Sequence, residues 1–436
     1  MVFSSLLFVF VFLVLNLVIY FLVDKKYKNQ VLLIFSLIFY VWGGPRFLIL
    51  LVGETFISWF CGVRIQEGGN QRIRKMYMIL ECVLLLGLLG IFKYTVFLLG
   101  NLQALTGFPE SIPNIVLPIG ISFYTFQLLS YVIDVYRGEV HAQPKFWKLL
   151  LYSSLFHQCI AGPIVRYETV AEEIDVRKVS GTDVYVGVRR FCVGLAKKAI
   201  LANSCASAAD TLLQPGVEAL SAQSALGLWL GMLFYMLQIY LDFSAYSDMA
   251  IGMGRMVGFH YLENFNYPYM AGSVQDFWRR WHISLSTFFR DYVYIPLGGS
   301  RCDKWKIVRN MSVVWFLTGM WHGASWNYIF WGIYYLIFLL LERFVIQNRI
   351  PKGWNHVYTL LVVFFGWVIF RIEDLGELGT VLLGLFGIGT SGFAGLEVST
   401  VFMGNLFFLI FAVISVTSLG KNVRRFLFET GKTNEA

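Results

Sequence analysis

Residues 2–23 read VFSSLLFVFVFLVLNLVIYFLV, and this stretch decides the fold class of the chain. It contains no Asp, Glu, Lys or Arg, and about 20 apolar residues are enough for a helix to cross a bilayer. A secretory signal peptide is the alternative interpretation. However, no basic residue precedes the run, and Asp24-Lys25-Lys26 follows it where a small-residue cleavage site would stand. We therefore expect residues 1–23 to form a first membrane span.

The rest of the chain has the same membrane composition. Of 436 residues, 57% are hydrophobic and 14% are charged, whereas soluble domains carry about a quarter charged residues. Apolar runs fall at about 1–23, 30–42, 46–63, 76–99, 115–133, 146–161, 184–204, 222–258, 277–297, 310–345, 355–371, 376–390 and 400–420. The runs at 30–42 and 146–161 are short, so we expect some re-entrant or tilted segments. The sequence predicts an all-α polytopic membrane protein with about eleven transmembrane helices, and residues 1–436 form one domain because no linker divides them.

The basic residues predict the orientation. The formal net charge is +8, but Lys and Arg sit in short loops between apolar runs, so span orientation explains them better than nucleic-acid binding does. By the positive-inside rule, the N-terminus lies outside and the C-terminus is cytoplasmic, in the cell (inner or plasma) membrane. The residues that carry this prediction are Lys25, Lys26, Lys28, Arg64, Arg72, Arg74 and Lys75, with Lys421, Arg424 and Arg425 in the tail.

Polar residues inside apolar runs are the next signal, because an ionisable side chain at the bilayer centre costs about 2.5 to 3.5 kcal/mol. A first group, YLDFSAYSD at residues 240–248, is followed by Gly252, Gly254 and Arg255. On a helix, Asp248 and Arg255 lie two turns apart on one face, which suits a shared buried network. Helix packing by small and polar residues and direct ligand contact both fit this pattern.

A second group, QDFWRRWHIS, occupies residues 275–284. Arg279 and Arg280, flanked by tryptophans, are typical of an interfacial anchor. The same guanidinium groups suit an anion site for phosphates such as those of a coenzyme. His282 fits either as a functional group or as a hydrogen-bonded structural histidine.

A third group, GMWHGASWN, occupies residues 319–327 within an apolar run. Little side-chain bulk is expected around His322, because Gly319, Gly323 and Ala324 are its small neighbours, so we expect a substrate to reach the imidazole on this side. A neutral imidazole accepts a proton near pH 7, as general-base catalysis requires. The chain has no GxSxG, HExxH or P-loop motif. We expect no metal, because His282 and His322 lack accompanying carboxylates or thiolates at usable spacing.

Taken together, these groups resemble the membrane-bound O-acyltransferase family, and within it the bacterial alginate O-acetyltransferase branch. The resemblance extends from about residue 117 to 341. The motifs that carry it are LPIGISF at 117–123, Gly162-Pro163, residues 242–248, ENFNYPY at 263–269, and the segments around His282 and His322.

The resemblance implies a ring of transmembrane helices around a central funnel or tunnel. His322 matches the family's catalytic histidine, and His282 matches its second signature position. The further residues expected to contact substrate or to support the site are Asp276, Arg279, Arg280, Ser325 and Asn327.

The implied reaction is acyl transfer from cytoplasmic acetyl-CoA, with no tightly bound cofactor. His322 would remove the proton of an acceptor hydroxyl that approaches from the other side, or would carry the acetyl group covalently; the sequence leaves both mechanisms open. The implied partners are an envelope polysaccharide, such as alginate, and an extracytoplasmic SGNH-type esterase or transferase.

Three other functions remain open from the residues. The sister branch of the family transfers D-alanine to teichoic acid. A proton-coupled transporter or flippase for an envelope glycan would use His322, Asp242 and Asp248 as a pathway, although the sequence shows no internal repeat. A non-catalytic scaffold of an export complex would tolerate replacement of the histidines.

Overall fold

The computed structural model describes residues 2–159, 162–346, 349–420 and 422. Over these ranges the chain forms helices and no strand, which confirms the all-α prediction. The basic residues predicted for the cytoplasmic tail, Lys421, Arg424 and Arg425, lie outside the described residues.

Six helices in the described ranges are long and apolar enough to cross a membrane. They are Pro45–Glu67, Gln71–Thr106, Ala225–Met256, Trp326–Ile346, Gly353–Arg371 and Leu396–Ser415. Two apolar helices are shorter, Phe8–Leu22 and Leu375–Gly384, so the helix in the first apolar run is shorter than the full span expected there. The chain is a multi-pass membrane protein, while the count of eleven crossings, the central funnel and the single domain stay predictions.

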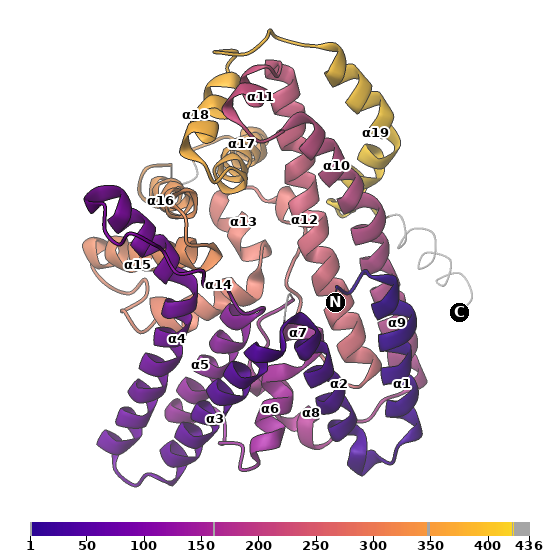
Figure 1. Ribbon diagram of the computed structural model, residues 1–436, viewed down its shortest axis with the longest axis vertical. Coiled ribbons are helices and arrows are strands. Elements are labelled where there is room, and N and C mark those ends of the chain that lie inside the picture. Colours follow the sequence, from indigo (N-terminus) through magenta and orange to yellow (C-terminus); the bar gives the residue numbers. More distant parts are fainter. Residues whose placement is uncertain (1, 160–161, 347–348, 421, 423–436) are drawn as a thin grey trace. The chain divides into compact units, whose positions relative to one another are not determined.

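The described chain divides into two compact units, and the boundary passes through helix α12 (Ala225–Met256). Unit 1 contains residues 1–195 and 246–263. Its other helices are η1 (Phe8–Phe12), α1 (Leu13–Leu22), η2 (Lys25–Tyr27), α2 (Lys28–Gly43), α3 (Pro45–Glu67), α4 (Gln71–Thr106), α5 (Ile121–Arg137), α6 (Phe146–Ser154), α7 (Phe156–Cys159), α8 (Tyr167–Asp175) and α9 (Gly181–Ala196). Helices α3, α4 and α5 pack against one another in a bundle (Figure 1).

Glycine lets helices α9 and α12 approach closely inside unit 1. A Cβ atom at Gly187 would lie 2.7 Å from the carbonyl oxygen of Gly252, and one at Gly252 would lie 2.8 Å from that of Gly187. One ion pair lies on each side of this contact: Arg190 to Asp248 at 3.0 Å and Arg255 to Asp183 at 3.3 Å. Asp248 and Arg255 therefore share one face of α12, as predicted, but they do not pair with each other. Each pairs with a residue of α9. This arrangement is the packing role left open for the first sequence group.

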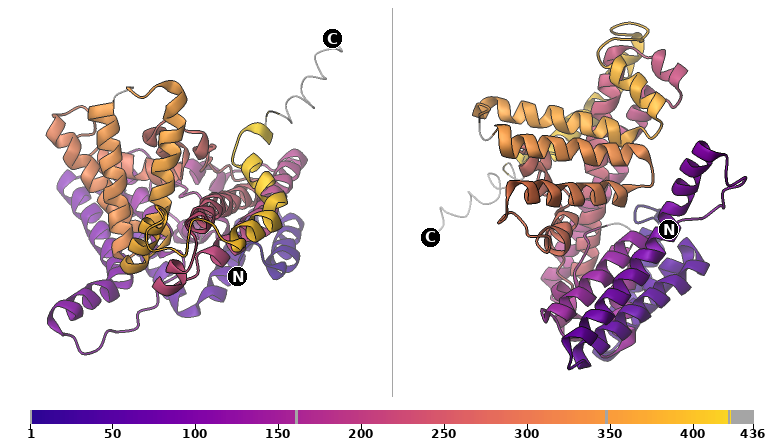
Figure 2. Two further views of the ribbon diagram at one scale, coloured as in Figure 1. Left: turned by 90° about the horizontal axis from the view of Figure 1, so that it is seen from above. Right: turned by 90° about the vertical axis from the view of Figure 1, so that its left-hand side faces the viewer.

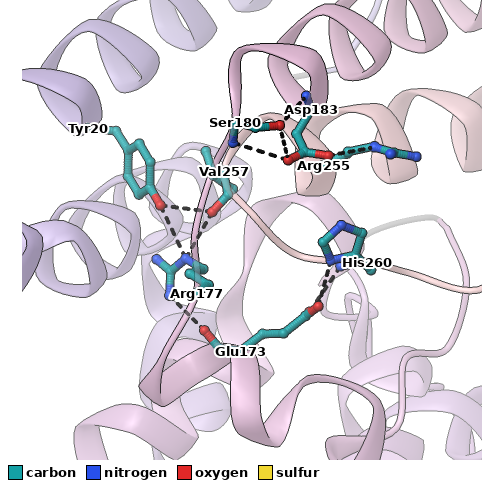
Figure 3. Close-up of polar contacts among 8 residues, drawn as sticks. All are labelled: Tyr20, Glu173, Arg177, Ser180, Asp183, Arg255, Val257 and His260. Atoms are coloured by element: carbon teal, nitrogen blue, oxygen red, sulfur yellow. Dashed lines mark hydrogen bonds and ion pairs between the residues drawn. The ribbon is translucent and has the colours of Figure 1, made fainter.

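Arg177 ties three segments of unit 1 together (Figure 3). Its Nε donates to the carbonyl oxygen of Val257 at 2.9 Å and to the Tyr20 hydroxyl at 3.1 Å, and its Nη1 donates to the carbonyl oxygen of Glu173 at 3.1 Å. The Glu173 carboxylate in turn contacts the Nδ1 atom of His260 at 2.6 Å. These bonds join Tyr20, Val257 and the end of α8 through the Nε and Nη1 atoms of one guanidinium group.

Unit 2 contains residues 196–245 and 264–436. Its further helices are η3 (Lys197–Ala202), α10 (Asn203–Leu212), α11 (Val217–Ser221), η4 (Pro268–Met270), α13 (Val274–Arg280), α14 (Ile283–Phe289), η5 (Arg290–Tyr294), α15 (Lys304–His322), α16 (Trp326–Leu341), η6 (Glu342–Ile346), α17 (Lys352–Arg371), α18 (Leu375–Gly384) and α19 (Leu396–Ser415). Helices α15, α16 and α17 lie side by side in this order (Figure 2).

The apolar run at 310–345 is broken in the structure, because α15 ends at His322 and α16 begins at Trp326. The two helices then pack with little space between their backbones. A Cβ atom at Gly319 would lie 2.5 Å from the Tyr328 carbonyl oxygen, and one at Gly332 would lie 2.5 Å from the Trp315 carbonyl oxygen. The break places His322 at the end of a helix, where its side chain faces the interior of unit 2.

Candidate active site

A cavity of about 550 Å³ lies within unit 2, a volume in the usual range for small-ligand pockets. Its walls come from α13, α14, η5, α15, α16 and η6. The lining residues are Gln275, Trp278, Arg279, Trp281, His282, Ile283, Leu285, Ser286, Thr287, Phe289, Arg290, Tyr294, Ser300, Met311, Val314, Trp315, Thr318, His322, Leu339 and Arg343. Both histidines singled out by the sequence line this one cavity, although they lie forty residues apart.

Aromatic rings surround the His322 imidazole. Its ring centroid lies 5.0 Å from that of Trp321, 4.9 Å from that of Trp331 and 5.1 Å from that of Phe370, each in an edge-to-face arrangement. The side chain is half-buried at the helix end. Rings that are themselves packed fix the imidazole plane, which a catalytic base needs.

His282 is held in an unusual backbone conformation between α13 and α14. Its φ is +45°, in the left-handed region that non-glycine residues seldom adopt. The side chain is 1% exposed, and its Nε2 atom has no hydrogen-bond partner in the described part of the chain. His282 lies outside the six candidate spans, and burial lowers its pKa to about 3, so the imidazole is neutral at physiological pH.

Trp321 contacts both histidines. Its ring centroid lies 5.6 Å from that of His282 and 5.0 Å from that of His322. On the opposite side of His282, the ring of Phe243 packs edge-to-face at 4.8 Å. The two imidazoles are thus linked through one indole ring.

Helix α13, which carries Arg279, is capped at its N-terminus. The Ser273 hydroxyl accepts a hydrogen bond from the backbone N–H of Asp276 at 3.0 Å. The Glu342 carboxylate accepts the N–H groups of Val274 at 2.7 Å and Gln275 at 3.0 Å. Because these N–H groups would otherwise be unsatisfied, the caps fix where the short helix begins.

Three arginines give the cavity a positive lining. They are Arg279 from α13, Arg290 from η5 and Arg343 from η6, and none of the lining residues that the structure describes is acidic. Arg290 is paired with Asp291 at 2.6 Å, outside the lining. An apolar cavity with this charge favours an anionic ligand, since guanidinium groups donate well to phosphate and carboxylate oxygens.

Four of the predicted site residues do not line the cavity. Asp276 and Arg280 form an ion pair with each other at 3.0 Å, one helical turn apart. Asn327 is fully buried, and its amide donates to the carbonyl oxygens of Ile369 at 3.3 Å and Phe370 at 3.2 Å, at the end of α17. Ser325 precedes α16, and its side chain makes no capping hydrogen bond.

The small residues beside His322 are needed for helix packing, and not for the substrate access that was expected. A Cβ atom at Gly323 would lie 2.2 Å from the Tyr328 ring, so packing and not substrate access requires glycine there. Likewise, the backbone of α16 fills the space in which a Cβ atom of residue 319 would lie. Access to His322 comes instead from the cavity between α13, α14 and α15.

The site residues predicted from the sequence did not include Arg290, Arg343 or Trp278. Arg343 ends a long apolar run, and a charge at such a position was a usable signal. The Trp278 indole N–H has no hydrogen-bond partner among the described residues, although an indole nitrogen is a donor. The cavity therefore combines two imidazoles, three guanidinium groups and one unsatisfied donor.

A second cavity of about 490 Å³ adjoins the first within unit 2. The two share the lining residues Gln275, Met311, Leu339 and Arg343. Arg343 is therefore placed to contact a ligand that extends from one cavity into the other.

Asp242, from the first sequence group, lies outside the cavity lining. Asp242 pairs with Lys198 at 2.9 Å within unit 2. Over the residues that the structure describes, no three His, Cys, Asp or Glu side chains are grouped closely enough to hold a metal ion.

The chain matches the model of the membrane-bound O-acyltransferase family over residues 137–375, a range that includes every predicted site residue. It is 40% identical to a probable alginate O-acetylase of Pseudomonas aeruginosa, over 95% of this chain and 82% of that protein. It is 32% identical to a peptidoglycan O-acetyltransferase of Helicobacter pylori, over 89% of this chain and 80% of that protein. A teichoic acid D-alanyltransferase of Bacillus subtilis is 27% identical over 59% of this chain and 69% of that protein.

Proposed function

The chain belongs to the membrane-bound O-acyltransferase family, and on that premise we propose that it transfers an acetyl group from acetyl-CoA to a hydroxyl group of an extracytoplasmic envelope polysaccharide. The observation that carries the proposal is the single cavity lined by both His282 and His322, with three arginines around it. The predicted family resemblance is confirmed by the match.

In this proposal, His322 acts as the general base. The acceptor oxygen forms a bond to the thioester carbonyl carbon while His322 takes the hydroxyl proton. The carbon–sulfur bond then breaks, the acetyl ester is complete, and the thiolate takes that proton from His322 and leaves as coenzyme A, which returns the imidazole to its neutral form. The aromatic rings that fix the imidazole support this role, because proton transfer depends on geometry.

The arginines bind the donor in this proposal. Acetyl-CoA carries several phosphate groups, and Arg279, Arg290 and Arg343 supply charged donors in the cavity lining. Because Arg343 also lines the adjoining cavity, an elongated donor has room to extend beyond the histidines. Arg280 is not assigned to the donor, because it is paired with Asp276.

The acceptor is inferred from the relatives. Alginate and peptidoglycan are named for the two acetyltransferases that resemble the chain over most of its length, whereas the D-alanyltransferase resembles a smaller part. We therefore favour acetyl transfer to a polysaccharide over D-alanyl transfer. The proposal includes an extracytoplasmic SGNH-type partner, an inner-membrane location, an outside N-terminus and a cytoplasmic C-terminus.

The test is turnover of radiolabelled acetyl-CoA by purified protein in nanodiscs, alone and with a candidate partner and polysaccharide. Wild type should consume acetyl-CoA, and His322→Ala should not, at equal thermal stability. His260→Ala is the matched control, since His260 is an exposed histidine of unit 1. A labelled acetyl-histidine trapped in wild type would replace direct transfer by a covalent relay. A folded wild type that consumes no acetyl-CoA contradicts the donor assignment and reopens D-alanyl transfer or transport.

A further inference from the structure

We propose that Asn264 and Ser284 are positioning residues that hold the His282 imidazole in the tautomer with its proton on Nδ1. The Nε2 atom of His282 then presents a lone pair, so it accepts a hydrogen bond from the substrate and does not donate one to an oxyanion. The kinetic consequence rests on the proposed acetyl transfer, whereas the tautomer itself does not.

The orientation of the Asn264 side chain is the first step. The backbone N–H of Ser284 lies 3.1 Å from Asn264 Oδ1. A backbone N–H can only donate, so the atom that faces it must be the amide oxygen and not the amide nitrogen. Asn264 is fully buried, which keeps this amide in place.

The Ser284 hydroxyl proton follows from that orientation. Ser284 Oγ lies 2.9 Å from the same Asn264 Oδ1, and an amide oxygen only accepts. The single hydroxyl proton of Ser284 is therefore directed to Asn264. Towards any other neighbour, Ser284 Oγ presents lone pairs.

The imidazole tautomer is the consequence. His282 Nδ1 lies 3.4 Å from Ser284 Oγ, and because that oxygen has already directed its proton elsewhere, Nδ1 must be the donor. A neutral imidazole carries one proton, so Nε2 is left unprotonated. Nε2 is also the ring nitrogen with no partner in the described part of the chain.

The backbone keeps the three groups together. The Ile283 N–H donates to the Asn264 carbonyl oxygen at 3.0 Å, and the Ser286 N–H donates to the His282 carbonyl oxygen at 3.1 Å. Together with the left-handed φ of His282, these bonds fix the direction in which the imidazole leaves the chain. Strained backbone held by its surroundings in this way is a recurring feature of functional sites.

The chemistry that fits Nε2 is a substrate hydroxyl or amide N–H. A buried acceptor without a partner costs free energy in the empty protein, and a donor group of the ligand removes that cost on binding. An oxyanion would instead face a lone pair and be repelled. The oxyanion donor of the reaction must therefore be another group.

The test combines a spectroscopic and a kinetic measurement. Protein labelled with 15N-histidine is reconstituted in nanodiscs, and the His282 resonances are assigned by comparison with His282→Asn among the six histidines of the chain. Wild type should show His282 with a protonated Nδ1 and an unprotonated Nε2. Ser284→Ala should shift the population towards the Nε2-protonated form, and Ser284→Thr should restore the wild-type spectrum.

The kinetic readout separates positioning from folding. Ser284→Ala should lower kcat about tenfold, the loss expected from one modest hydrogen bond, with the KM for acetyl-CoA unchanged and kcat restored in Ser284→Thr. The control is Ser312→Ala, because the Ser312 hydroxyl lies outside the cavity lining and, among the described residues, bonds only to the Val308 carbonyl oxygen of its own helix at 2.9 Å. Ser312→Ala should change neither the spectrum nor kcat.

Two results would overturn the proposal: a wild-type His282 protonated on Nε2, or a Ser284→Ala protein with unchanged tautomer populations. Neither depends on turnover. If instead the tautomer is as expected and wild type consumes no acetyl-CoA, the proposed function fails and the positioning role of Asn264 and Ser284 stands.

Discussion

Polar side chains lie among apolar helices in two places, the crossing of α9 with α12 in unit 1 and the histidine cavity of unit 2. The two places differ in the charges that surround these side chains. At the crossing, Asp183, Arg190, Asp248 and Arg255 form two opposite-charge pairs around a glycine contact. In the cavity, three arginines face a lining without acidic residues. The same sequence signal, a charge in an apolar run, therefore marks helix packing in one place and the lining of a cavity in the other.

The difference lies in the partners. Burying a charge is tolerated when an opposite charge or a hydrogen bond compensates its lost hydration. At the crossing, the protein supplies the partners, and the ion pairs join α9 to α12. Where the protein does not, as at His282 Nε2, a ligand is the natural partner. Changes at the crossing should thus affect stability, and changes in the cavity should affect chemistry.

The largest contrast is expected between two histidines. His322→Gln should lower kcat by about 10²- to 10⁴-fold, the usual contribution of a positioned base, with little change in thermal stability. His157, buried in unit 1 with its Nδ1 atom 3.3 Å from the Tyr261 hydroxyl, should behave in the opposite way. His157→Gln should lower the unfolding temperature and leave kcat per folded molecule unchanged. Turnover and thermal unfolding of both variants decide the point, and an active His322→Gln protein would break the comparison.

Replacing each of the adjacent arginines Arg279 and Arg280 should change the KM for acetyl-CoA by different amounts. Arg279→Gln removes a cavity cation and should raise the KM for acetyl-CoA by about 10- to 100-fold, because a hydrogen bond to a charged group contributes about 1.5–3 kcal/mol. Arg280→Gln removes the partner of Asp276 outside the cavity and should change KM far less. Steady-state kinetics at constant ionic strength measure both. Equal effects on KM would mean that Arg280 contacts the donor after all.

Crowding at the crossing should cost stability. Gly187→Ala places a Cβ atom against the Gly252 carbonyl oxygen and should destabilise the protein by about 1–3 kcal/mol. Gly181→Ala, at the start of the same helix, meets no atom within 4 Å and should be neutral or slightly stabilising. Unfolding in detergent, followed by tryptophan fluorescence, measures the two. A stable Gly187→Ala protein would show that the helices separate without loss.

The smallest effect concerns pH. Burial lowers the pKa of His282 to about 3, below the value of about 6.5 for an exposed histidine, so the unfolded chain binds a proton that the folded site rejects. The stability from burying the neutral ring is present above pH 6.5. It should fall by about 1.4 kcal/mol for each pH unit below that value, down to about pH 3.

The variant His282→Asn isolates this contribution, because asparagine tolerates the left-handed conformation. The difference in unfolding free energy between wild type and variant, measured from pH 7 to pH 5, should shrink as the pH falls. A difference independent of pH would mean that the ring takes up its proton at the same pH in the folded and the unfolded protein.

The sequence determined the class of the protein, because hydropathy is a sum over neighbouring residues and needs no tertiary contact. It also determined the family, since motifs such as those around His282 and His322 are local strings. The two histidines that the sequence indicated as site residues line one cavity in the structure. Their catalytic roles stay predictions.

Only the tertiary structure decided which charged residues line a cavity and which pair with each other. Arg279 and Arg280 are neighbours in sequence, but adjacent residues on a helix point about 100° apart, so one faces the cavity and the other faces Asp276. The contribution of Arg343 depends on how η6 meets α13, a contact between segments far apart in the chain. Local sequence sets the cost of a buried charge, whereas the position of its partner is set by the packing of distant helices.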